Sequence, residues 1–475
     1  MMNNQKNKTV KKKILMFLTA ILLCFVLVIG AACDLPSIFP SSKDESKTEQ
    51  PSDEQKPSDE QKPSDEQKPS DEQKPSDEQK PSDEQKPSDE QKPSDEQKPS
   101  DEQKPSDEQK PSDEQKPSDE QKPSDEQKPS DEDTDDDLSI HFLELGCANA
   151  GDCVLIKSGD TEVLIDAGAK SNTAPTQAML DYVAEYCTDG VLEYVIATHA
   201  HEDHIAGLVG NKDDSTSTGF LYKYQIGTII QFARTGSTSK IYGRYQKAVE
   251  YCKEQGTKVY TALECTKGDN GASAIYYLNE AQTISMQILY QKFYEQKAST
   301  ENDYSVCMLL THESEEMKYN ALFTGDLEKS GEESLVTNNP DLPHCDLYKG
   351  GHHGSSTSSN DVLLNKITPS NIAICTCAGT FEYAKKPSDG GSILNTFPTQ
   401  AAIDRMSKHT QNIYVTTLGI INSSTYATTG YQSMNGNIVF YYDKEEKIFK
   451  LRCSNNTTIL KDTEWFKANR TWNGV

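Results

Sequence analysis

A hexapeptide repeat limits how much of this 475-residue chain can fold. The sequence Pro-Ser-Asp-Glu-Gln-Lys occurs thirteen times in register from Pro51 to Lys128 and runs on into an acidic cluster that ends at Asp137. The repeat has no apolar side chain to bury, and the proline in each unit interrupts helices. We therefore expect residues 33–137 to be a disordered, extended tether, with a specific binding tail as the alternative. A folded domain is expected at 138–475.

The N-terminus has the features of an export signal. Basic residues, including Lys11–Lys13, precede the apolar run Ile14–Ile29, and Gly30–Ala32 come directly before Cys33. A basic region, an apolar region and small residues are typical of a secretory signal, and the cysteine after them resembles a bacterial lipoprotein signal. We expect residues 1–32 to be a lipoprotein-type signal peptide and Cys33 to carry the lipid. An uncleaved membrane anchor is the alternative, since the apolar run is just long enough to span.

A dense group of metal-binding side chains follows the apolar run Val195–Ala197. The six residues from His199 to His204 read His-Ala-His-Glu-Asp-His and hold three of the nine histidines of the chain. On extended backbone His199 and His201 point to one side, and the following turn can aim Asp203 and His204 at a second point. Imidazole and carboxylate suit zinc, manganese or iron. The pattern predicts two divalent ions, zinc or manganese, about 3.5–4 Å apart; a polar loop with solvated histidines is the alternative.

Other motifs place a polar side chain directly after a predicted strand. Val163–Ile165 leads into Asp166, and Ala321–Phe323 leads into a Thr-Gly-Asp sequence that ends at Asp326. Downstream, a short strand ending at Tyr348 leads into Lys-Gly-Gly-His-His-Gly-Ser. Glycine makes the backbone after each strand pliable, so the neighbouring side chains can turn toward a common site.

Taken together, these motifs resemble those of the metallo-β-lactamase-fold hydrolases. More narrowly, they are similar to the hydrolase domain of ComEC-type competence proteins, which internalise DNA. The segments that carry this narrower resemblance are Ile140–Gly146, Gly151–Asp152, Asn302–Ser305 and His352–Ser355. The resemblance covers roughly residues 138–450. It implies an α/β fold, a four-layer αββα sandwich.

The resemblance also implies the ligands of a dinuclear metal centre. It places one ion at His199, His201 and Asp326. It places the other ion at Asp203, His204, Asp326 and His352, so that Asp326 bridges the two. His352 is preferred over His353 because the family's last ligand usually follows directly after the glycine that ends the strand.

Three further roles are expected around these ligands. Asp166 is expected to hold a ligand histidine through its far nitrogen, as metal sites usually require, or else only to cap its turn. Asp203 is expected to orient the attacking hydroxide as well as to bind metal. His353 is expected to donate a proton or to stabilise the phosphoryl oxygens, and packing against the turn is its alternative.

The sequence departs from the family pattern at two places. The histidine that many members carry before the bridging aspartate is missing, and Asn302–Ser305 occupies its place. His312 could fill the gap, but it follows an apolar strand beside Glu313, which predicts an exposed turn. Late in the domain, Asn395–Pro398 replaces a His-Pro pair. Because the histidine before the bridging aspartate is missing, we expect fewer protein ligands at the first ion.

Charge limits the choice of partner. Residues 138–475 hold 28 Lys and Arg and 39 Asp and Glu, a net charge of −11, without a dense basic cluster. A non-specific nucleic-acid binder usually shows a basic face, so tight DNA binding is disfavoured. Phosphoester hydrolysis is not, because bound metal ions supply local positive charge.

Periodicity gives a coarse order of elements in the domain. We expect a helix at about 175–187 and a helix with a 3.6-residue period at 239–254. The segment 211–280, rich in Thr, Ser, Tyr and Gly, is interpreted as an insertion near the substrate-shaping loops. Strands are expected near 139–145, 153–157, 161–166, 193–198, 283–289, 305–311, 319–324, 345–348, 436–442 and 447–453. The ten cysteines of the domain are expected to be mostly buried thiols, with Cys147–Cys153 as one candidate bridge.

These observations predict an extracytoplasmic metal-dependent hydrolase anchored to the cell membrane. The expected activity is that of a phosphodiesterase, with nucleic acid or a wall or surface phosphodiester as substrate and no protein partner. Alternatives are a surface binding or scaffold protein with a vestigial metal site, and a hydrolase of another ester or amide class such as β-lactams.

Overall fold

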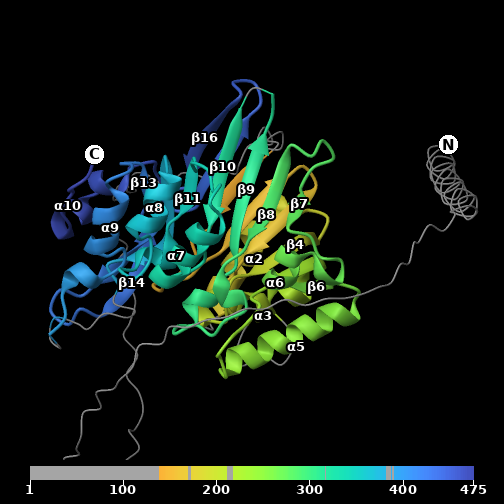
Figure 1. The fold of residues 1–475 in the computed structure, drawn as a ribbon. Helices are drawn as coiled ribbons and strands as arrows, with labels where there is room; N and C mark the ends of the chain where they lie inside the picture. The colour runs from red at the N-terminus through yellow and green to blue at the C-terminus, as the bar shows by residue number, and fades with distance from the viewer. Residues whose placement is uncertain (1–137, 169–172, 211–217, 316, 381–386, 388–389) are drawn as a thin grey trace, which may run out of the picture. The chain divides into compact units, whose positions relative to one another are not determined.

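The computed structural model describes residues 138–475 except 169–172, 211–217, 316, 381–386 and 388–389 (Figure 1). The expected signal peptide, the lipid attachment at Cys33 and the repeat lie outside the described residues. Among the helices in the described part, none has both the length and the apolarity to cross a lipid bilayer.

Two mixed sheets, each of eight strands in the described residues, form the centre of the domain (Figure 1). The first sheet contains, in spatial order, β16 Ile448–Cys453, β15 Ile438–Asp443, β1 Ser139–Phe142, β2 Val154–Ser158, β3 Thr161–Ile165, β4 Val191–Ala197, β5 Gln225–Gln231 and β6 Lys258–Thr261. The second contains β14 Thr428–Ser433, β13 Ile413–Ile421, β12 Asn371–Ala378, β11 Leu347–Lys349, β10 Lys318–Phe323, β9 Cys307–Glu313, β8 Ile284–Leu289 and β7 Ile275–Tyr277. Strands β3 to β6 are parallel in the first sheet, and β10 to β13 are parallel in the second.

Helices cover the outer face of each sheet. Those that pack with the first sheet are α2 Thr173–Tyr186, α3 Glu202–Val209, α4 Phe220–Lys223, α5 Lys240–Glu254 and α6 Ala262–Lys267. Those that pack with the second are α7 Lys329–Asn338, α8 Asp361–Ile367, α9 Gln400–Met406 and α10 Glu464–Asn469. The α5 helix shows why: its buried Ile241, Tyr245, Ala248, Val249 and Cys252 recur at helical spacing and form one apolar stripe.

The main core lies between the two sheets. Phe142 of β1 and Phe323 of β10 are fully buried and stack across this interface, with ring centroids 6.2 Å apart. A second apolar cluster fills the space between the second sheet and its helices. The predicted α/β fold, an αββα sandwich of four layers, is confirmed.

Sheet topology brings the predicted motifs together. Asp166 follows β3 and His199 follows β4, and these two strands are neighbours and parallel. In the second sheet Asp326 follows β10 and His352 follows β11, which are also neighbours and parallel. Because parallel neighbouring strands end at the same edge, each sheet supplies two of these motifs to one end of the sandwich.

Two expectations about local structure are wrong. His312 does not lie in an exposed turn: it is buried within β9, where its ring packs against Tyr442 at 4.6 Å between centroids. The Cys147–Cys153 bridge is not formed, since all ten cysteines of the domain are free and all but Cys453 are buried. The expectation that the cysteines are mostly buried thiols is confirmed.

The segment 211–280 also differs from the expected insertion. The helix expected at 239–254 is present as α5. On either side of it, β5 and β6 extend the first sheet by two parallel strands. The segment therefore continues the β-α-β pattern of the sheet, and its polar composition reflects exposed helix and edge-strand faces.

Candidate metal centre

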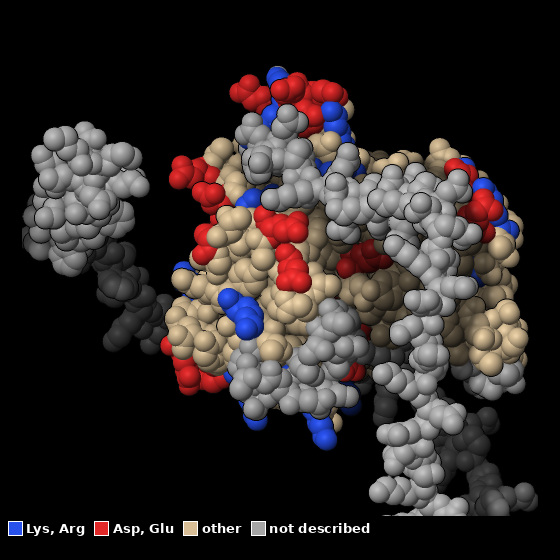
Figure 2. Space-filling view, turned by 180° about the vertical axis from the view of Figure 1, so that it is seen from behind, with Lys and Arg blue, Asp and Glu red and all other residues tan. Residues whose placement is uncertain are grey.

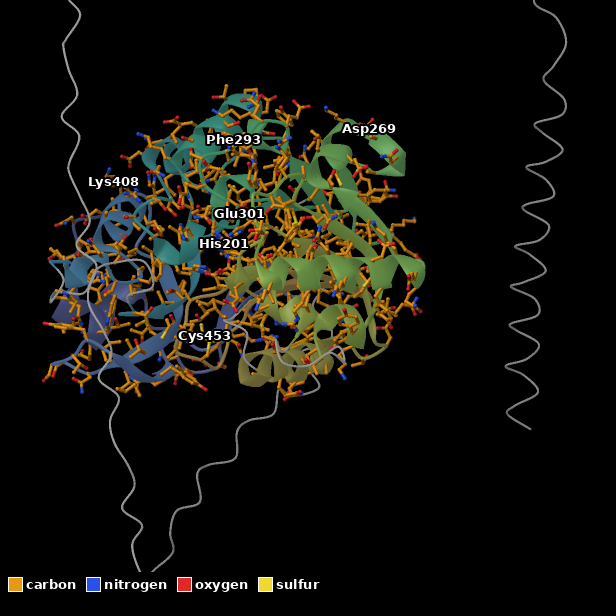
Figure 3. All side chains as sticks on the ribbon, turned by 90° about the horizontal axis from the view of Figure 1, so that it is seen from below. His201, Asp269, Phe293, Glu301, Lys408 and Cys453 are labelled. Atoms are coloured by element: carbon orange, nitrogen blue, oxygen red, sulfur yellow. The ribbon has the colours of Figure 1, made fainter. Side chains whose placement is uncertain are left out.

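The motif from His199 to His204 spans the end of β4 and the start of α3. His199 and Ala200 lie between the two elements, His201 has extended backbone just before the helix, and Asp203 lies in its first turn. The path brings four candidate ligand side chains, His199, His201, Asp203 and His204, to the start of α3. All of them are buried except His201, which is half-buried. In Figure 3, His201 lies in the middle of the view, between the green and the blue elements of the domain.

The first group of ligand atoms lies around His199. Its Nε2 is 3.0 Å from Nδ1 of His201. Ligand atoms of His199, His204 and Asp326 all lie within 4.8 Å of one another. Two of the three residues expected at the first ion, His199 and Asp326, therefore lie in one group with His204, and His201 lies next to His199.

The second group lies around Asp203 and includes His353. Ligand atoms of Asp203, His204 and His353 lie within 4.8 Å of one another. Nε2 of His353 is 3.4 Å from Oδ2 of Asp203 and 3.3 Å from Oδ2 of Asp326. Since the same oxygen of Asp326 is 3.0 Å from Nε2 of His204, Asp326 lies between the two groups, where a bridging ligand is required.

The two adjacent histidines, His352 and His353, lie on different sides of a sharp turn. His352 and His353 both have positive φ, 47° and 54°, so the chain turns sharply there. His353 faces the second group, whereas Nε2 of His352 is 3.7 Å from Asp326 and its Nδ1 is 3.0 Å from Oγ1 of Thr357. The turn places the imidazole of His353 beside both Asp203 and Asp326, so the structure brings His353 into this group, and which of the two histidines is the last ligand stays a prediction.

Asp166 lies behind His204, as the family resemblance implied. Its Oδ2 is 2.8 Å from Nδ1 of His204, the nitrogen that faces away from Asp326. The same carboxylate accepts hydrogen bonds from the backbone N–H and the hydroxyl of Thr198, at 2.8 and 2.7 Å. A carboxylate on the far nitrogen fixes the orientation of the imidazole. The residue has φ 54°, so its turn is strained as well as bonded.

Two buried charged side chains beside the centre were not predicted as site residues. Asp152 and Lys349 are both buried and lie 2.5 Å apart, Oδ2 to Nζ. Asp152 Oδ1 is in turn 3.2 Å from Nδ1 of His353. The sequence carried a signal for each, since Asp152 belongs to the Gly-Asp pair and Lys349 opens the Lys-Gly-Gly-His-His sequence that carry the resemblance. Only the fold shows that the two meet.

Electrostatics favour the ionised form of Asp326 and Asp152. Burial opposes a charge on Asp326, but the imidazoles of His204, His353 and His352 outweigh burial and hold the pKa of Asp326 well below its ordinary value. Burial likewise opposes both charges of the Asp152–Lys349 pair, yet the pKa of Asp152 is lowered and that of Lys349 is raised. Ionised carboxylates are the form that binds a cation.

The donor set fits a pair of metal ions. Oδ1 of Asp326 and Nε2 of His353 are buried and make no hydrogen bond within the described residues. Buried polar atoms are nearly always bonded, so these two atoms indicate a ligand that the protein itself does not supply. Nitrogen and oxygen donors converging from the ends of three strands, β4, β10 and β11, suit zinc or manganese.

The departures from the family pattern are visible in the structure. The segment Asn302–Ser305 does reach the centre, but it brings a hydroxyl: Oγ of Ser305 is 3.4 Å from Nδ1 of His199 and accepts a hydrogen bond from the backbone N–H of Asp326. In place of the late histidine, the ring of Phe397 lies 6.1 Å from the ring of His353. Neither segment adds an imidazole.

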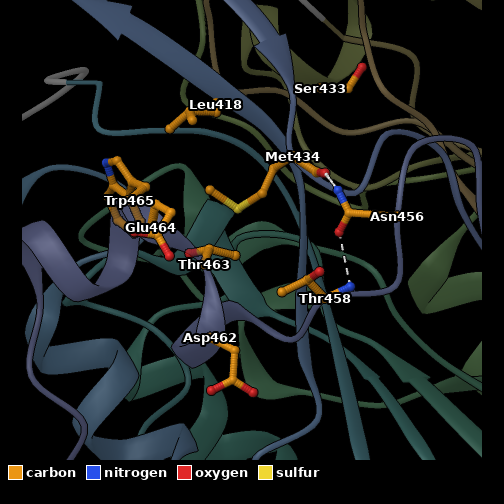
Figure 4. A pocket seen from close by; sticks show the side chains of 9 residues that line it. All are labelled: Leu418, Ser433, Met434, Asn456, Thr458, Asp462, Thr463, Glu464 and Trp465. Carbon is orange, nitrogen blue, oxygen red and sulfur yellow. Dashed lines mark hydrogen bonds between the residues drawn. The ribbon is translucent and has the colours of Figure 1, made fainter.

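Other surface features lie outside this centre. Acidic and basic side chains are interspersed on the visible part of the face in Figure 2, where the described residues form no broad basic patch. A separate pocket is lined by β13, β14 and the C-terminal segment, with Met434 and Trp465 in its wall (Figure 4). None of the predicted site residues lines that pocket.

Comparisons with known proteins agree with this geometry. Residues 148–214, which contain the His199–His204 motif, match the family model of the metallo-beta-lactamase superfamily. A curated relative, the competence protein ComA of Neisseria gonorrhoeae, is 38% identical over 88 residues. That match covers 18% of this chain and only 11% of the length of ComA.

The chain is also similar, at low identity, to solved structures. The metallo-beta-lactamase fold protein YhfI from Bacillus subtilis is 13% identical, with 64% of this chain and 100% of that chain covered and a TM-score of 0.33. The subclass B3 metallo-beta-lactamase MEM-A1, isolated from a soil metagenome library, is 12% identical, with 45% and 79% covered and a TM-score of 0.26. The resemblance to the metallo-β-lactamase superfamily, whose members are metal-dependent hydrolases, is confirmed.

Proposed function

We propose that this protein is a dinuclear metal-dependent phosphodiesterase. The observation that carries the proposal is the position of Asp326, whose Oδ2 lies 3.0 Å from His204 and 3.3 Å from His353, between two groups of buried ligand atoms. In the proposed assignment His199, His201 and Asp326 hold one ion. Asp203, His204, Asp326 and His353 hold the other.

The ions, when bound, supply a hydroxide near neutral pH and positive charge for the developing oxyanion. The protein supplies geometry and exclusion of water. Asp203 is buried in the first turn of α3. There its carboxylate would bind a metal ion and also orient the attacking water. Nε2 of His352 lies 3.7 Å from Oδ2 of Asp326, where it is placed to contact the phosphoryl oxygens of a substrate.

Local charge favours an isolated phosphodiester over a long polyanion. Oε1 of Glu328 accepts a hydrogen bond from the side-chain Nδ2 of Asn302 at 3.0 Å. The same oxygen is 3.8 Å from Nδ1 of His352, so a carboxylate lies beside the centre. A second and third phosphate of a nucleic-acid strand would meet this negative charge in a domain that is already acidic. The similarity to a competence protein supports nucleic acid as a substrate class, and the charge supports a surface phosphodiester.

Turnover of bis-p-nitrophenyl phosphate tests the proposal. The purified protein loaded with Zn²⁺ or Mn²⁺ is expected to hydrolyse this diester. Asp203→Ala is expected to lose at least about 100-fold in kcat/KM, because several kcal/mol of charge stabilisation disappear with one ligand. Asp181→Ala is the matched control, since Asp181 is an exposed aspartate on α2.

Parallel assays separate the alternatives. Turnover of the small diester without degradation of single-stranded DNA favours a surface phosphodiester, and cleavage of both favours nucleic acid. Nitrocefin turnover without diester turnover would show a β-lactam hydrolase. Failure to take up either metal would show a binding or scaffold protein and end the enzymatic proposal.

We also place the enzyme outside the cytoplasm, held at the cell membrane by the N-terminal leader. The support is the basic, apolar and small-residue order that ends at Cys33, together with the tether that follows it. The curated relative is a competence protein, which this chain matches over a short segment.

A further inference from the structure

Lys349 is a buried lysine with no access to a substrate. It is the last residue of β11, and its side chain is 2% exposed. Nζ lies 2.5 Å from Oδ2 of Asp152 and 3.4 Å from the backbone carbonyls of Gly325 and Gly350. These contacts hold the ammonium against Asp152 and the two glycine carbonyls.

Asp152 connects this lysine to the metal centre. Its Oδ1 is 3.2 Å from Nδ1 of His353, and its Oδ2 is 3.7 Å from Nδ1 of His204. Its backbone is also tied to the centre, because its N–H donates to the carbonyl of Asp203 at 3.1 Å and its carbonyl accepts from Gly168 at 2.9 Å. The carboxylate therefore lies behind two imidazoles, in contact with the nitrogens that face away from the ions.

An unpaired carboxylate at this depth would be costly, since burying a lone charge carries a large desolvation penalty. Lys349 removes that cost and leaves Oδ1 of Asp152 available to His353. Nδ1 of His353 also lies 3.1 Å from the carbonyl of Cys375. Both partners are acceptors, so Nδ1 carries the proton and Nε2 presents its lone pair to the centre.

We propose that Lys349 and Asp152 act as a positioning pair that fixes His353 as a ligand of the second ion. Lys349 acts through Asp152, and Asp152 acts through His353. The inference rests on the proposed dinuclear centre and extends it to a lysine in the other sheet. It predicts that both residues control metal affinity, not only the stability of the fold.

Zinc binding tests the pair without relying on activity. Metal-free protein is titrated with Zn²⁺ against a chromophoric zinc chelator, and the affinities of the two sites are fitted separately. Asp152→Asn keeps the size of the side chain and is expected to weaken the second site by about 10–100-fold while the first is unchanged. Lys349→Met is expected to weaken the same site, and Lys349→Arg, which keeps the charge, to restore part of the affinity.

A double variant tests whether the two residues act in series. If Lys349 works only through Asp152, the variant Asp152→Asn/Lys349→Met loses no more zinc affinity than Asp152→Asn alone. Lys157→Met is the matched control, because Lys157 pairs with Glu162 in the first sheet, away from these ligands. It is expected to leave both zinc sites unchanged.

The outcomes separate this inference from the proposed function. Wild type that binds fewer than two zinc ions overturns the dinuclear centre and the pair with it. Wild type that binds two, with unchanged affinities in both single variants, overturns the pair alone, as does an additive loss in the double variant. If Lys349→Met does not fold, Asp152→Asn decides, and a loss of unfolding free energy without a loss of zinc affinity shows a structural role only.

Discussion

At the scale of single residues, the adjacent histidines show how a turn decides chemistry that a motif leaves open. His352 and His353 are the same residue type at adjacent positions, and Nε2 of His353 lies within 3.4 Å of Asp203 and 3.3 Å of Asp326. Two consecutive residues with positive φ rotate the second side chain to the side where a ligand is needed. A motif reports which side chains are near one another in the chain, and the backbone conformation decides which one binds.

Replacement of each histidine by alanine gives different expected results. His353→Ala removes a ligand, so we expect one metal equivalent to be lost and turnover of bis-p-nitrophenyl phosphate to fall by at least about 100-fold. His352→Ala is expected to keep both equivalents and to lose turnover only. Metal content by mass spectrometry, measured beside kcat and KM, checks both. Loss of metal in His352→Ala with retention in His353→Ala would restore the assignment made from the sequence.

Contacts within one motif and positions directly after a strand can be predicted from the sequence, whereas contacts between the two sheets cannot. The sequence identifies His199 and His201 because neighbours in the chain stay neighbours in space. It identifies Asp166 and Asp326 because each directly follows a strand. It does not identify the Asp152–Lys349 pair as a contact, because β2 and β11 lie in different sheets and only the packing of the sheets brings them together.

At the scale of elements, strands with strong apolar runs are predictable and polar ones are not. The expected strands from 139 to 166 and the pair from 436 to 453 are present as β1 to β3 and as the hairpin of β15 and β16. The sequence does not predict β5 as a strand, because Gln225, Gly227 and Gln231 interrupt its apolar pattern. Its neighbours β4 and β6 supply the hydrogen bonds that override this weak local preference.

His312 shows the same effect in the opposite direction. A histidine beside Glu313 at the end of an apolar run suggests an exposed turn, but the strand continues to Glu313 and pairs with β8 and β10. The ring is buried because Tyr442, and Phe449 behind it, supply aromatic surface from the first sheet. Aromatic partners so distant in the chain leave no local signal.

A buried glutamate of α7 bonds to the backbone just before α8, and its protonation makes the stability of the fold depend on pH. Glu332 of α7 is fully buried and accepts hydrogen bonds from the backbone N–H groups of Ser359 and Asn360 just before α8, at 2.6 and 2.9 Å. Burial raises the pKa of Glu332 to about 7, from 4.5. Since the folded pKa is raised, the stability that this group contributes is fully present below pH 4.5 and is lost as pH rises through 7.

The prediction is a fall in the stability of the wild type relative to Glu332→Gln between pH 5 and pH 8. A shift of this size corresponds to at most about 3 kcal/mol in the free energy of unfolding. Urea unfolding of both metal-free proteins at the two pH values measures the difference. Glu333→Gln, at the exposed neighbouring position, is the control. A constant difference across this range would mean that Glu332 is ionised in the fold throughout.

At the scale of the whole molecule, charge and composition divide the chain into two functional parts. Residues 1–137 carry 20 Lys and 36 Asp and Glu, a net charge of −16, and residues 138–475 carry −11. Like charges on the tether and the domain repel, and the repeat has nothing apolar with which to bind the domain surface. We therefore expect the tether to set the distance of the enzyme from its anchor and to leave the chemistry of the centre unchanged.

The anchor can be tested at Cys33, with Cys24 as an internal control inside the apolar run Ile14–Ile29. If Cys33 carries the lipid, the full chain expressed in a bacterium incorporates labelled palmitate and partitions into detergent. Cys33→Ala is expected to lose the label, because the thiol is the acceptor, whereas Cys24→Ala keeps it. A wild type that stays in the membrane fraction without label would show that the apolar run is an uncleaved anchor. Each buried CH₂ group contributes about 0.8 kcal/mol to membrane binding, so a single acyl chain binds the membrane only weakly. Stable attachment therefore requires either several acyl chains on Cys33 or the intact apolar run.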